Sequence, residues 1–189
     1  YAKATTPNAI NLFKCNSGAT SYIYDLSINT PIIKKGLDNA TEVSYHISDS
    51  DANNNSNPLP DNYTSTGDET IYVRIKIPAI SCYLVKTFKL QLTSPAVATK
   101  PADMNVCSNK TKAPVQLISQ SDKILNGQNK SLYTVSYYAS LADATANTNI
   151  LTGAYTTEST TIYARVQVLN DADCFAITDF KVNVQITPT

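Results

Sequence analysis

The chain has 189 residues and carries no net charge, with 15 basic and 15 acidic side chains. Its length suits one large or two small domains, and its balanced charge argues against nucleic acid or an anionic membrane surface as a partner. Charged residues make up only 16%, while 12 tyrosines and four cysteines without a tryptophan are typical of an extracellular β-protein. The single histidine supplies little for acid–base chemistry, so we expect no enzyme here.

Neither a membrane span nor a signal peptide is visible. No apolar run approaches the 18 or so residues that a spanning helix needs. The opening residues lack a basic stretch followed by an apolar one, and the chain closes like a linker. We therefore expect a piece of a longer secreted protein.

An internal repeat organises the chain, because several short motifs return 91 or 92 positions later. The repeated motifs are VSY at 43–45 and 135–137, DA at 51–52 and 143–144, YT at 63–64 and 155–156, and TIYVRI at 70–75, which returns as TIYARV at 161–166. Two prolines break the strand pattern in 93–101. We predict two copies of one module, covering residues 1–94 and 95–189.

Apolar residues alternate with polar ones within each copy, which predicts antiparallel strands. The alternating segments are 71–77, 88–92, 162–168 and 180–186. The short segments 78–81 and 170–173 between these strands are expected to be hairpin loops. Only 48–52 and 140–144 look helical, each with a Ser followed three residues later by Asp, as in an approximate capping box.

The four cysteines keep the same spacing in both copies, 67 residues from Cys15 to Cys82 and from Cys107 to Cys174. Four cysteines allow three pairings. The repeat favours Cys15 with Cys82 and Cys107 with Cys174, because each module then holds its own bridge, worth about 4 kcal/mol. The alternative is four reduced, buried thiols. Zinc is disfavoured, because no CxxC or HxxxH spacing occurs.

The segments VSYH, SDSDANNNSNPL, NYT and TIYVRIKIPAISCYLVKTFKLQL resemble a recurrent extracellular repeat of Bacteroidota surface proteins. Bearers of that repeat include SprB-type gliding adhesins and other gliding-associated proteins that the type nine secretion system exports. The resemblance covers both modules. It implies a parent protein associated with the outer membrane, displayed at the bacterial surface and in contact with polysaccharide or solid surfaces. The second copy has Tyr138 in place of His46, which argues against an essential histidine.

An acidic stretch begins like a calcium loop, since Asp49, Asp51 and Asn53 place oxygen ligands on alternate residues. The pattern then fails, because the twelfth position is Pro60 in place of Glu and the second copy has Leu141 in place of Asp49. We expect a capped, solvated turn, keep calcium as the alternative, and expect no other cofactor.

Arg74 and Arg165 are the only arginines and occupy the same repeat position. A guanidinium on a strand can clamp a carboxylate or an acidic sugar, or it can complete a cross-strand pair on the outer face of a sheet. We favour the cross-strand pair and keep ligand binding as the alternative.

Tyr22 and Tyr24 are the aromatic candidates for stacking on a sugar ring. The positions aligned with them, 92 residues later, are Pro114 and Gln116, so a binding role would be specific to the first copy. The alternative is that both tyrosines are plain strand residues.

We therefore predict an all-β protein of two tandem Ig-like antiparallel β-sandwich domains, each with one disulfide. An antibody-type domain is not expected, because no tryptophan is present. The function predicted is that of non-catalytic stalk or adhesive modules, arrayed with further repeats, whose bridges limit extension under load. The alternative is carbohydrate-binding or accessory modules of a secreted polysaccharide-active protein, and an exposed aromatic platform would favour it.

Overall fold

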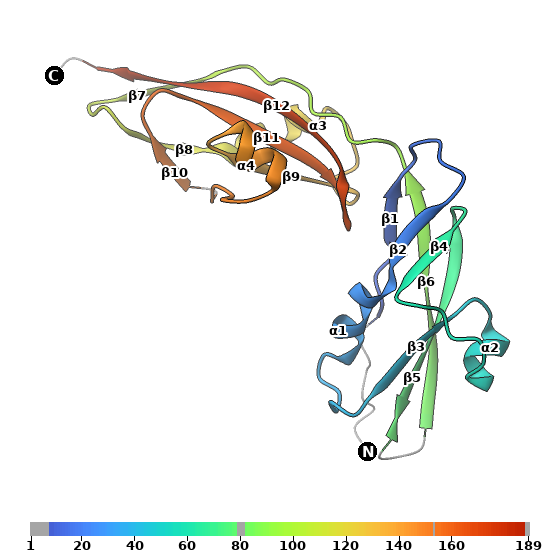
Figure 1. Ribbon diagram of the computed structural model, residues 1–189. Helices are drawn as coiled ribbons and strands as arrows, with labels where there is room; N and C mark the ends of the chain where they lie inside the picture. Colours follow the sequence, from blue (N-terminus) through green and yellow to red (C-terminus); the bar gives the residue numbers. More distant parts are fainter. Residues whose placement is uncertain (1–7, 79–81, 153, 188–189) are drawn as a thin grey trace. The chain divides into compact units, whose positions relative to one another are not determined.

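The computed structural model describes residues 8–78, 82–152 and 154–187 (Figure 1). The chain divides into two compact units, Tyr1–Thr93 and Ser94–Thr189, which we call modules 1 and 2. The unit boundary falls within the proline-containing segment that separates the two repeats. No helix in the described ranges is both long and apolar enough to cross a membrane.

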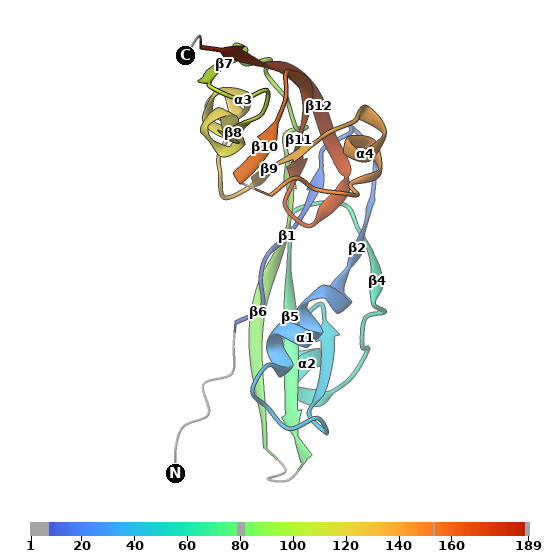
Figure 2. The ribbon, with the colours of Figure 1, turned by 90° about the vertical axis from the view of Figure 1, so that its left-hand side faces the viewer.

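Module 1 contains a four-stranded and a two-stranded sheet (Figure 2). The larger sheet has the order β1-β6-β5-β3, formed by Leu12–Cys15, Cys82–Thr93, Glu69–Ile77 and Glu42–His46. The smaller sheet pairs β2 (Tyr22–Asp25) with β4 (Asn62–Ser65). Short helices connect the strands: η1 (Leu26–Ile28), α1 (Asn29–Lys34) and α2 (Asp49–Asn54). β1 runs parallel to β6, whereas the other neighbours are antiparallel.

Module 2 repeats this arrangement. Its larger sheet has the order β7-β12-β11-β9, formed by Met104–Ser108, Asp171–Ile186, Thr160–Val168 and Tyr133–Tyr138. Its smaller sheet pairs β8 (Ala113–Gln116) with β10 (Ala154–Thr157), and its helices are η3 (Leu117–Gln120), α3 (Ser121–Leu125) and α4 (Leu141–Ala146). The prediction of two tandem, mostly β, sandwich modules is therefore confirmed.

The alternation of β5 explains how module 1 buries its core. Ile71, Val73 and Ile75 are fully buried and form one cluster with the buried tyrosines of β2. Successive side chains of a strand point to opposite faces, so Tyr72 and Arg74 face away from that core. The two sheets therefore pack through the apolar face that the sequence predicts.

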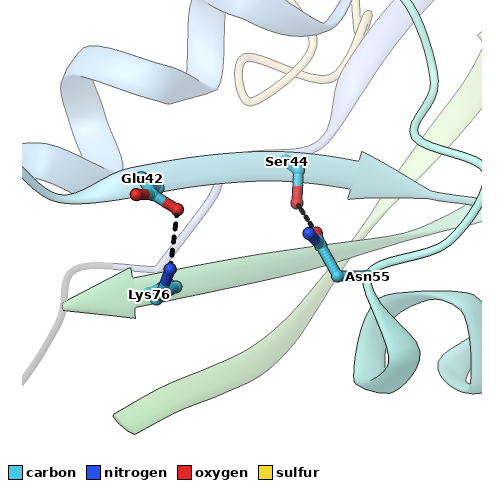
Figure 3. A network of polar contacts seen from close by, with 4 residues as sticks. All are labelled: Glu42, Ser44, Asn55 and Lys76. Carbon is cyan, nitrogen blue, oxygen red and sulfur yellow. Dashed lines mark hydrogen bonds and ion pairs between the residues drawn. The ribbon is translucent and has the colours of Figure 1, made fainter. Parts of the chain in front are cut away.

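Helix α2 covers part of the opposite, outer face of the larger sheet, where it contacts β3, β5 and β6. The same outer face carries polar contacts, which Figure 3 shows on β3 and β5. Lys76 forms a 3.3 Å ion pair with its cross-strand partner Glu42, and Ser44 donates a hydrogen bond to Asn55 at the end of α2. The ion pair thus links β3 to β5, and Ser44 links β3 to the end of helix α2.

The predicted strands and the two capped helices are confirmed, whereas η1–α1 and η3–α3 were not predicted. Their signal is a helical spacing of buried side chains: Leu26, Asn29 and Ile33 in module 1, with Leu117, Gln120 and Ile124 in module 2. This i, i+3, i+7 pattern is short and holds a polar residue at its centre, so it does not stand out in the sequence.

The predicted hairpin loop at 170–173 is shorter in the structure. β11 ends at Val168 and β12 begins at Asp171, its register partner. Asn170 turns the chain with a φ of 62°, a left-handed conformation that Asn tolerates. Of the matching loop at 78–81, residues 79–81 lie outside the described part of the chain.

Candidate functional site

The two cysteines of module 1 lie far apart along β6. Cys15 is the register partner of Thr93, the last residue of β6, whereas Cys82 is the first residue of that strand. Eleven residue steps separate Cys82 from Thr93, which corresponds to about 36 Å at the usual rise of a strand. A disulfide requires Cα atoms about 4.4–6.8 Å apart, so these two cysteines cannot be bonded in the folded module.

Module 2 has the same arrangement. Cys107 on β7 is the register partner of Gln185, near the end of β12. Cys174 precedes Phe175, which pairs with Gln167 at the start of the regular part of β12. The ten residue steps from Phe175 to Gln185 span about 33 Å, so Cys107 and Cys174 are also too far apart to bond.

Each module thus has an upstream end, where the chain comes in, and a downstream end, where it leaves. The incoming chain contacts the long last strand well before its end, through Asn8 on Lys86 in module 1 and Lys100 on Asp179 in module 2. The later cysteine of each module, Cys82 or Cys174, lies toward the upstream end. The earlier cysteine, Cys15 or Cys107, lies at the downstream end, beside the last residues of β6 or β12.

In each module one cysteine is bonded and the other is free: the downstream cysteine is bonded in module 1 and the upstream cysteine is bonded in module 2. Cys15 and Cys174 are disulfide-bonded, whereas Cys82 and Cys107 are free and exposed. Because the chain has four cysteines, the bonded pair is Cys15 with Cys174. The predicted pairings of Cys15 with Cys82 and of Cys107 with Cys174, one bridge in each module, are therefore wrong. Sequence spacing identified the equivalent cysteines but not the strand length between them.

Arg74, a candidate ligand-binding residue, is engaged by its own module. Its Nη1 donates to the carbonyl oxygens of Ala52 and Asn53, both at 3.0 Å, near the C-terminal end of α2. Its guanidinium carbon lies 3.6 Å from the ring centre of Tyr83. Cations favour the exposed carbonyls of a helix C-terminus, so this arginine fastens α2 to the sheet.

Arg165 makes the corresponding contacts and is 2% exposed. It donates to the carbonyl oxygens of Ala144 and Thr145 in α4, and its guanidinium carbon lies 3.4 Å from the ring centre of Phe175. Its Nη2 also donates to the carbonyl oxygen of Ala172 at 2.6 Å. Burial lowers the pKa of this guanidinium, which nevertheless stays charged at neutral pH. Arg165 therefore braces the irregular stretch of β12 that holds Cys174.

The same arrangement of arginine and aromatic ring recurs beside the upstream cysteine of both modules. Tyr83 follows Cys82 and Phe175 follows Cys174, and each ring lies under the arginine of the neighbouring strand. A guanidinium over an aromatic face is attractive, particularly when it is desolvated. The two arginines, predicted as cross-strand or ligand residues, thus hold the residue next to a cysteine.

The acidic stretch of module 1 forms a capped helix. The Ser48 hydroxyl accepts a hydrogen bond from the Asp51 amide and donates to the Asp51 carboxylate. Ser56 and Asn57 donate to the other oxygen of Asp51. These hydrogen bonds lower the pKa of Asp51 below its ordinary value. Asp143 has the same role in module 2 through Ser140, Asn149 and Thr148.

The three calcium candidates serve this helix. Both oxygens of Asp51 accept side-chain hydrogen bonds, and Asn53 donates to the carboxylate and carbonyl oxygens of Asp49. Within the part of the chain that the structure describes, no three His, Cys, Asp or Glu side chains form a group that could hold a metal ion. Asp49, Asp51 and Asn53 are thus engaged by hydrogen bonds of the capped turn.

Tyr22 and Tyr24 are core residues of module 1, 8% and 1% exposed, and offer no open ring face to a sugar. Their hydroxyls donate to Asn16 and to the carbonyl oxygen of Gln91. The strand registers equate them with Ala113 and Val115, which are also buried. The alignment with Pro114 and Gln116 was displaced by one residue, which in a strand exchanges the inner face for the outer one.

The single histidine is also part of the fold. His46 is fully buried, with Nε2 hydrogen-bonded to the Ser44 hydroxyl and Nδ1 to the carbonyl oxygen of Ser56. Tyr138 takes its place in module 2 and donates to Asn147. Both side chains anchor the loop that follows the capped helix to strand β3 or β9.

Comparison with protein families gives one match that occurs twice along the chain. Residues 11–96 and 103–188 each match the family described as the Flavobacterium inter-domain disulphide bond domain. The two matches coincide with the two structural modules and support an Ig-like repeat protein of the Bacteroidota. No curated protein matches the chain.

Several solved structures of tandem immunoglobulin domains align with the chain. The titin I-band fragment I67–I69 has 7% identity and a TM-score of 0.30, with 94% of this chain and 64% of that chain covered. Sidekick-1 immunoglobulin domains 1–5 have 9% identity and a TM-score of 0.27, with 95% of this chain and 41% of that chain covered. Drosophila OTK extracellular domains 3–5 have 10% identity and a TM-score of 0.28, with 95% of this chain and 59% of that chain covered. The chain spans less than two thirds of each of these structures.

Proposed function

Because the chain belongs to the Flavobacterium inter-domain disulphide bond domain family, we propose that its modules are non-catalytic, load-bearing stalk units of a bacterial cell-surface adhesin. The observation that carries the proposal is the bond between Cys15 and Cys174, the downstream cysteine of one module and the upstream cysteine of the next. Such a bond gives force applied to the two ends of the chain a covalent route that bypasses most of the polypeptide.

The length that this route protects is large. Residues 16–173 lie inside the loop that the disulfide closes, so they do not extend while the bond is intact. At about 3.5 Å per extended residue, these 158 residues correspond to about 550 Å of chain. Without the bond, unfolding of both modules under load releases that length. The bond therefore keeps a stalk at constant length, whereas separate bridges within the modules would leave the connecting segment unprotected.

The bond also bears on where the protein works. Disulfides persist in oxidising environments such as the cell surface and are rare in the cytosol. We place the modules outside the cell, in a parent protein of the SprB type that the type nine secretion system exports and that contacts polysaccharide or solid surfaces. In a long array, weak contacts of many copies add up through avidity.

The binding-module alternative requires an exposed aromatic platform. In the described part of the chain, Tyr83 is the one aromatic side chain among the exposed large hydrophobics. One face of its ring is occupied by Arg74, and the sugar-stacking candidates Tyr22 and Tyr24 are buried. The stalk function therefore accounts better for the side chains observed.

Single-molecule stretching tests the stalk proposal. The 189-residue chain is pulled from its two ends, with Cys82→Ser and Cys107→Ser present so that only the bond between Cys15 and Cys174 can form. We expect a reducing agent to add about 550 Å of releasable length. The same chain with Cys15→Ser and Cys174→Ser is the control and should release this length in either buffer. Equal extension with and without reductant in the bonded chain would overturn the proposal.

A further inference from the structure

We propose that Gln128 and Tyr133 are positioning residues for the disulfide that joins the two modules. Their side chains clasp residues 94–99, which we call the connecting segment, onto module 2. The clasp limits the motion of Cys15 with respect to Cys174 and so favours the bond between them. The inference goes beyond the stalk function, because it concerns how the bond forms and not the load that the bond carries.

The side-chain amide of Gln128 makes the central contact of the clasp. Its Oε1 accepts a hydrogen bond from the Val97 amide at 3.0 Å, and its Nε2 donates to the Val97 carbonyl oxygen at 2.6 Å. One side chain thus satisfies both backbone polar groups of Val97, as a neighbouring strand would. Nε2 also donates to the carbonyl oxygen of Leu125, the last residue of α3, at 2.9 Å. The contact with Leu125 fixes the glutamine to module 2.

Two further contacts hold the ends of the connecting segment. The hydroxyl of Tyr133, a residue that is buried in module 2, donates to the carbonyl oxygen of Ser94 at 2.8 Å. The amide of Thr99 donates to the carbonyl oxygen of Ile124 in α3 at 3.0 Å. Positions 94, 97 and 99 are therefore attached, and no more than two successive residues lie between attached positions.

The first attached residue lies next to the strand pair that carries Cys15. Ser94 directly follows Thr93, the last residue of β6 and the register partner of Cys15. Cys15 is thus coupled, through one register pair and one peptide bond, to a residue that Tyr133 holds on module 2. Cys174 belongs to module 2 as well. The connection between the two cysteines therefore passes through a fixed point.

The clasp and the bond are present together in the structure, so the clasped segment is compatible with the bonded geometry. Without Gln128 and Tyr133, residues 94–98 would be a flexible linker, which gives an effective concentration in about the millimolar range. Fixing that linker removes conformations in which the two sulfur atoms lie apart, and this raises their effective concentration. By linkage, the bond must strengthen the clasp by the same factor.

The clasp is specific to module 2. Leu37 takes the place of Gln128, directly after the glycine that follows the short helix, and Thr41 takes the place of Tyr133, two residues before the VSY motif. Leucine has no hydrogen-bonding side chain, and threonine is shorter than tyrosine by an aromatic ring. The clasp residues therefore occur in the module whose upstream cysteine, Cys174, is bonded.

Equilibration with glutathione tests the positioning role. The variants are Gln128→Leu, Tyr133→Phe and the double variant, in a chain that also carries Cys82→Ser and Cys107→Ser. One protein thiolate attacks glutathione disulfide, forms a mixed disulfide and expels one glutathione. The second protein thiolate attacks the protein sulfur of that mixed disulfide and expels the other glutathione, so glutathione disulfide is the two-electron oxidant. The ratio of bonded to reduced chain, separated on gels after alkylation, gives the effective concentration of the two thiols.

We expect the double variant to lower this effective concentration by about fivefold or more, with a smaller loss for each single variant. A denaturing concentration of urea should remove the difference. Ser140→Ala weakens the cap of α4 in the same module and is the matched control, which should leave the effective concentration unchanged. An effective concentration that the double variant does not lower would overturn the inference.

Hydrogen exchange gives a readout that a merely structural role would not change. The Val97 and Thr99 amides should exchange more slowly in the bonded chain than in the reduced chain, by the factor that the clasp adds to the effective concentration. The double variant should lose this dependence on the bond. Equal exchange in the bonded and reduced forms of the unchanged chain would also overturn the inference. The stretching experiment leaves Gln128 and Tyr133 in place, so the two proposals can fail separately.

Discussion

The guanidinium of Arg165 stacks on the ring of Phe175, with 3.4 Å between the guanidinium carbon and the ring centre. Phe175 directly follows the bonded Cys174, and the same guanidinium also binds the carbonyl oxygen of Ala172. One buried side chain therefore fixes both sides of the cysteine that receives the disulfide. Such preorganisation favours bond formation because the thiol is already held in place.

Replacement of Arg165 by Ala should destabilise module 2 by about 2–3 kcal/mol, because buried carbonyl oxygens lose a charged donor. Arg74→Ala should cost less, about 1 kcal/mol, because Arg74 is only partly buried. Urea denaturation measures both changes, and the exposed Lys110→Ala is the control for loss of a positive charge. We also expect Arg165→Ala to lower the dithiothreitol concentration that reduces the disulfide. Equal losses for the two arginines would contradict the bracing role of Arg165.

Acid should weaken the capped helices through Asp51 and Asp143. Hydrogen bonds lower the pKa of both carboxyl groups in the folded chain, so the folded state binds these protons more weakly than the unfolded chain does. Their contribution is complete above the unfolded value, about 3.9, and is lost as the pH falls through the lower folded value.

The double variant Asp51→Asn and Asp143→Asn should therefore be less stable at pH 7 and should lose less stability between pH 5 and pH 2. Urea denaturation across this range measures the slope of unfolding free energy against pH. The exposed Asp61→Asn removes a carboxylate outside the caps and should leave the slope closer to that of the unchanged chain. A double variant with an unchanged slope would show that the capping hydrogen bonds do not couple to folding.

The N-cap serines allow a related prediction without titration. Ser48 and Ser140 each accept a hydrogen bond from the amide three residues later, at 3.0 and 3.1 Å. Ser→Ala at either position should lower the free energy of unfolding by about 1 kcal/mol, whereas Ser→Gly should lower it by only about a few tenths of a kcal/mol. Thermal unfolding of the single variants measures the difference. The Ser50→Ala change, inside α2 and exposed, is the matched control.

The sequence predicted the strands well because burial on one face requires a period of two, as in Ile71, Val73 and Ile75. It predicted the capped helices because Ser48 and Asp51 form a local motif. Local patterns also identified Arg74 as a residue on the outer face. They could not show that its guanidinium reaches the end of α2, because α2 lies about 20 residues away along the chain.

The disulfide could not be predicted in the same way. Repeat spacing shows that Cys15 and Cys107 are equivalent, but the pairing depends on which end of β6 or β12 each cysteine occupies. The parallel register of β1 on β6 decides this, and parallel pairing over four residues has no clear sequence signal. The one-residue displacement at Tyr24 has a similar origin, because the two repeats differ in length between β2 and β4.

Tyr24 provides a test of core packing against ligand binding. Tyr24→Ala should destabilise module 1 by about 3–5 kcal/mol, because it removes a ring that is 1% exposed. Tyr24→Phe keeps the ring, loses the hydrogen bond to the Gln91 carbonyl and should cost about 1 kcal/mol. Ile23→Ala on the same strand is the control, because Ile23 is exposed and should change stability by less than about 0.5 kcal/mol. A stable Tyr24→Ala chain would contradict the core assignment.

Glycan binding separates the stalk from the binding-module alternative. We expect no saturable binding of the 189-residue chain to an array of polysaccharides, with or without calcium, because the aromatic candidates Tyr22 and Tyr24 are buried and both oxygens of the Asp51 carboxylate already accept hydrogen bonds. If binding does occur, Tyr83→Ala identifies whether the partly exposed ring of Tyr83 contributes. Tyr83→Phe keeps the ring and is the matched control. Saturable binding that Tyr83→Ala abolishes and Tyr83→Phe preserves would move the function from spacer to lectin, with Arg74 and Tyr83 as its contact residues.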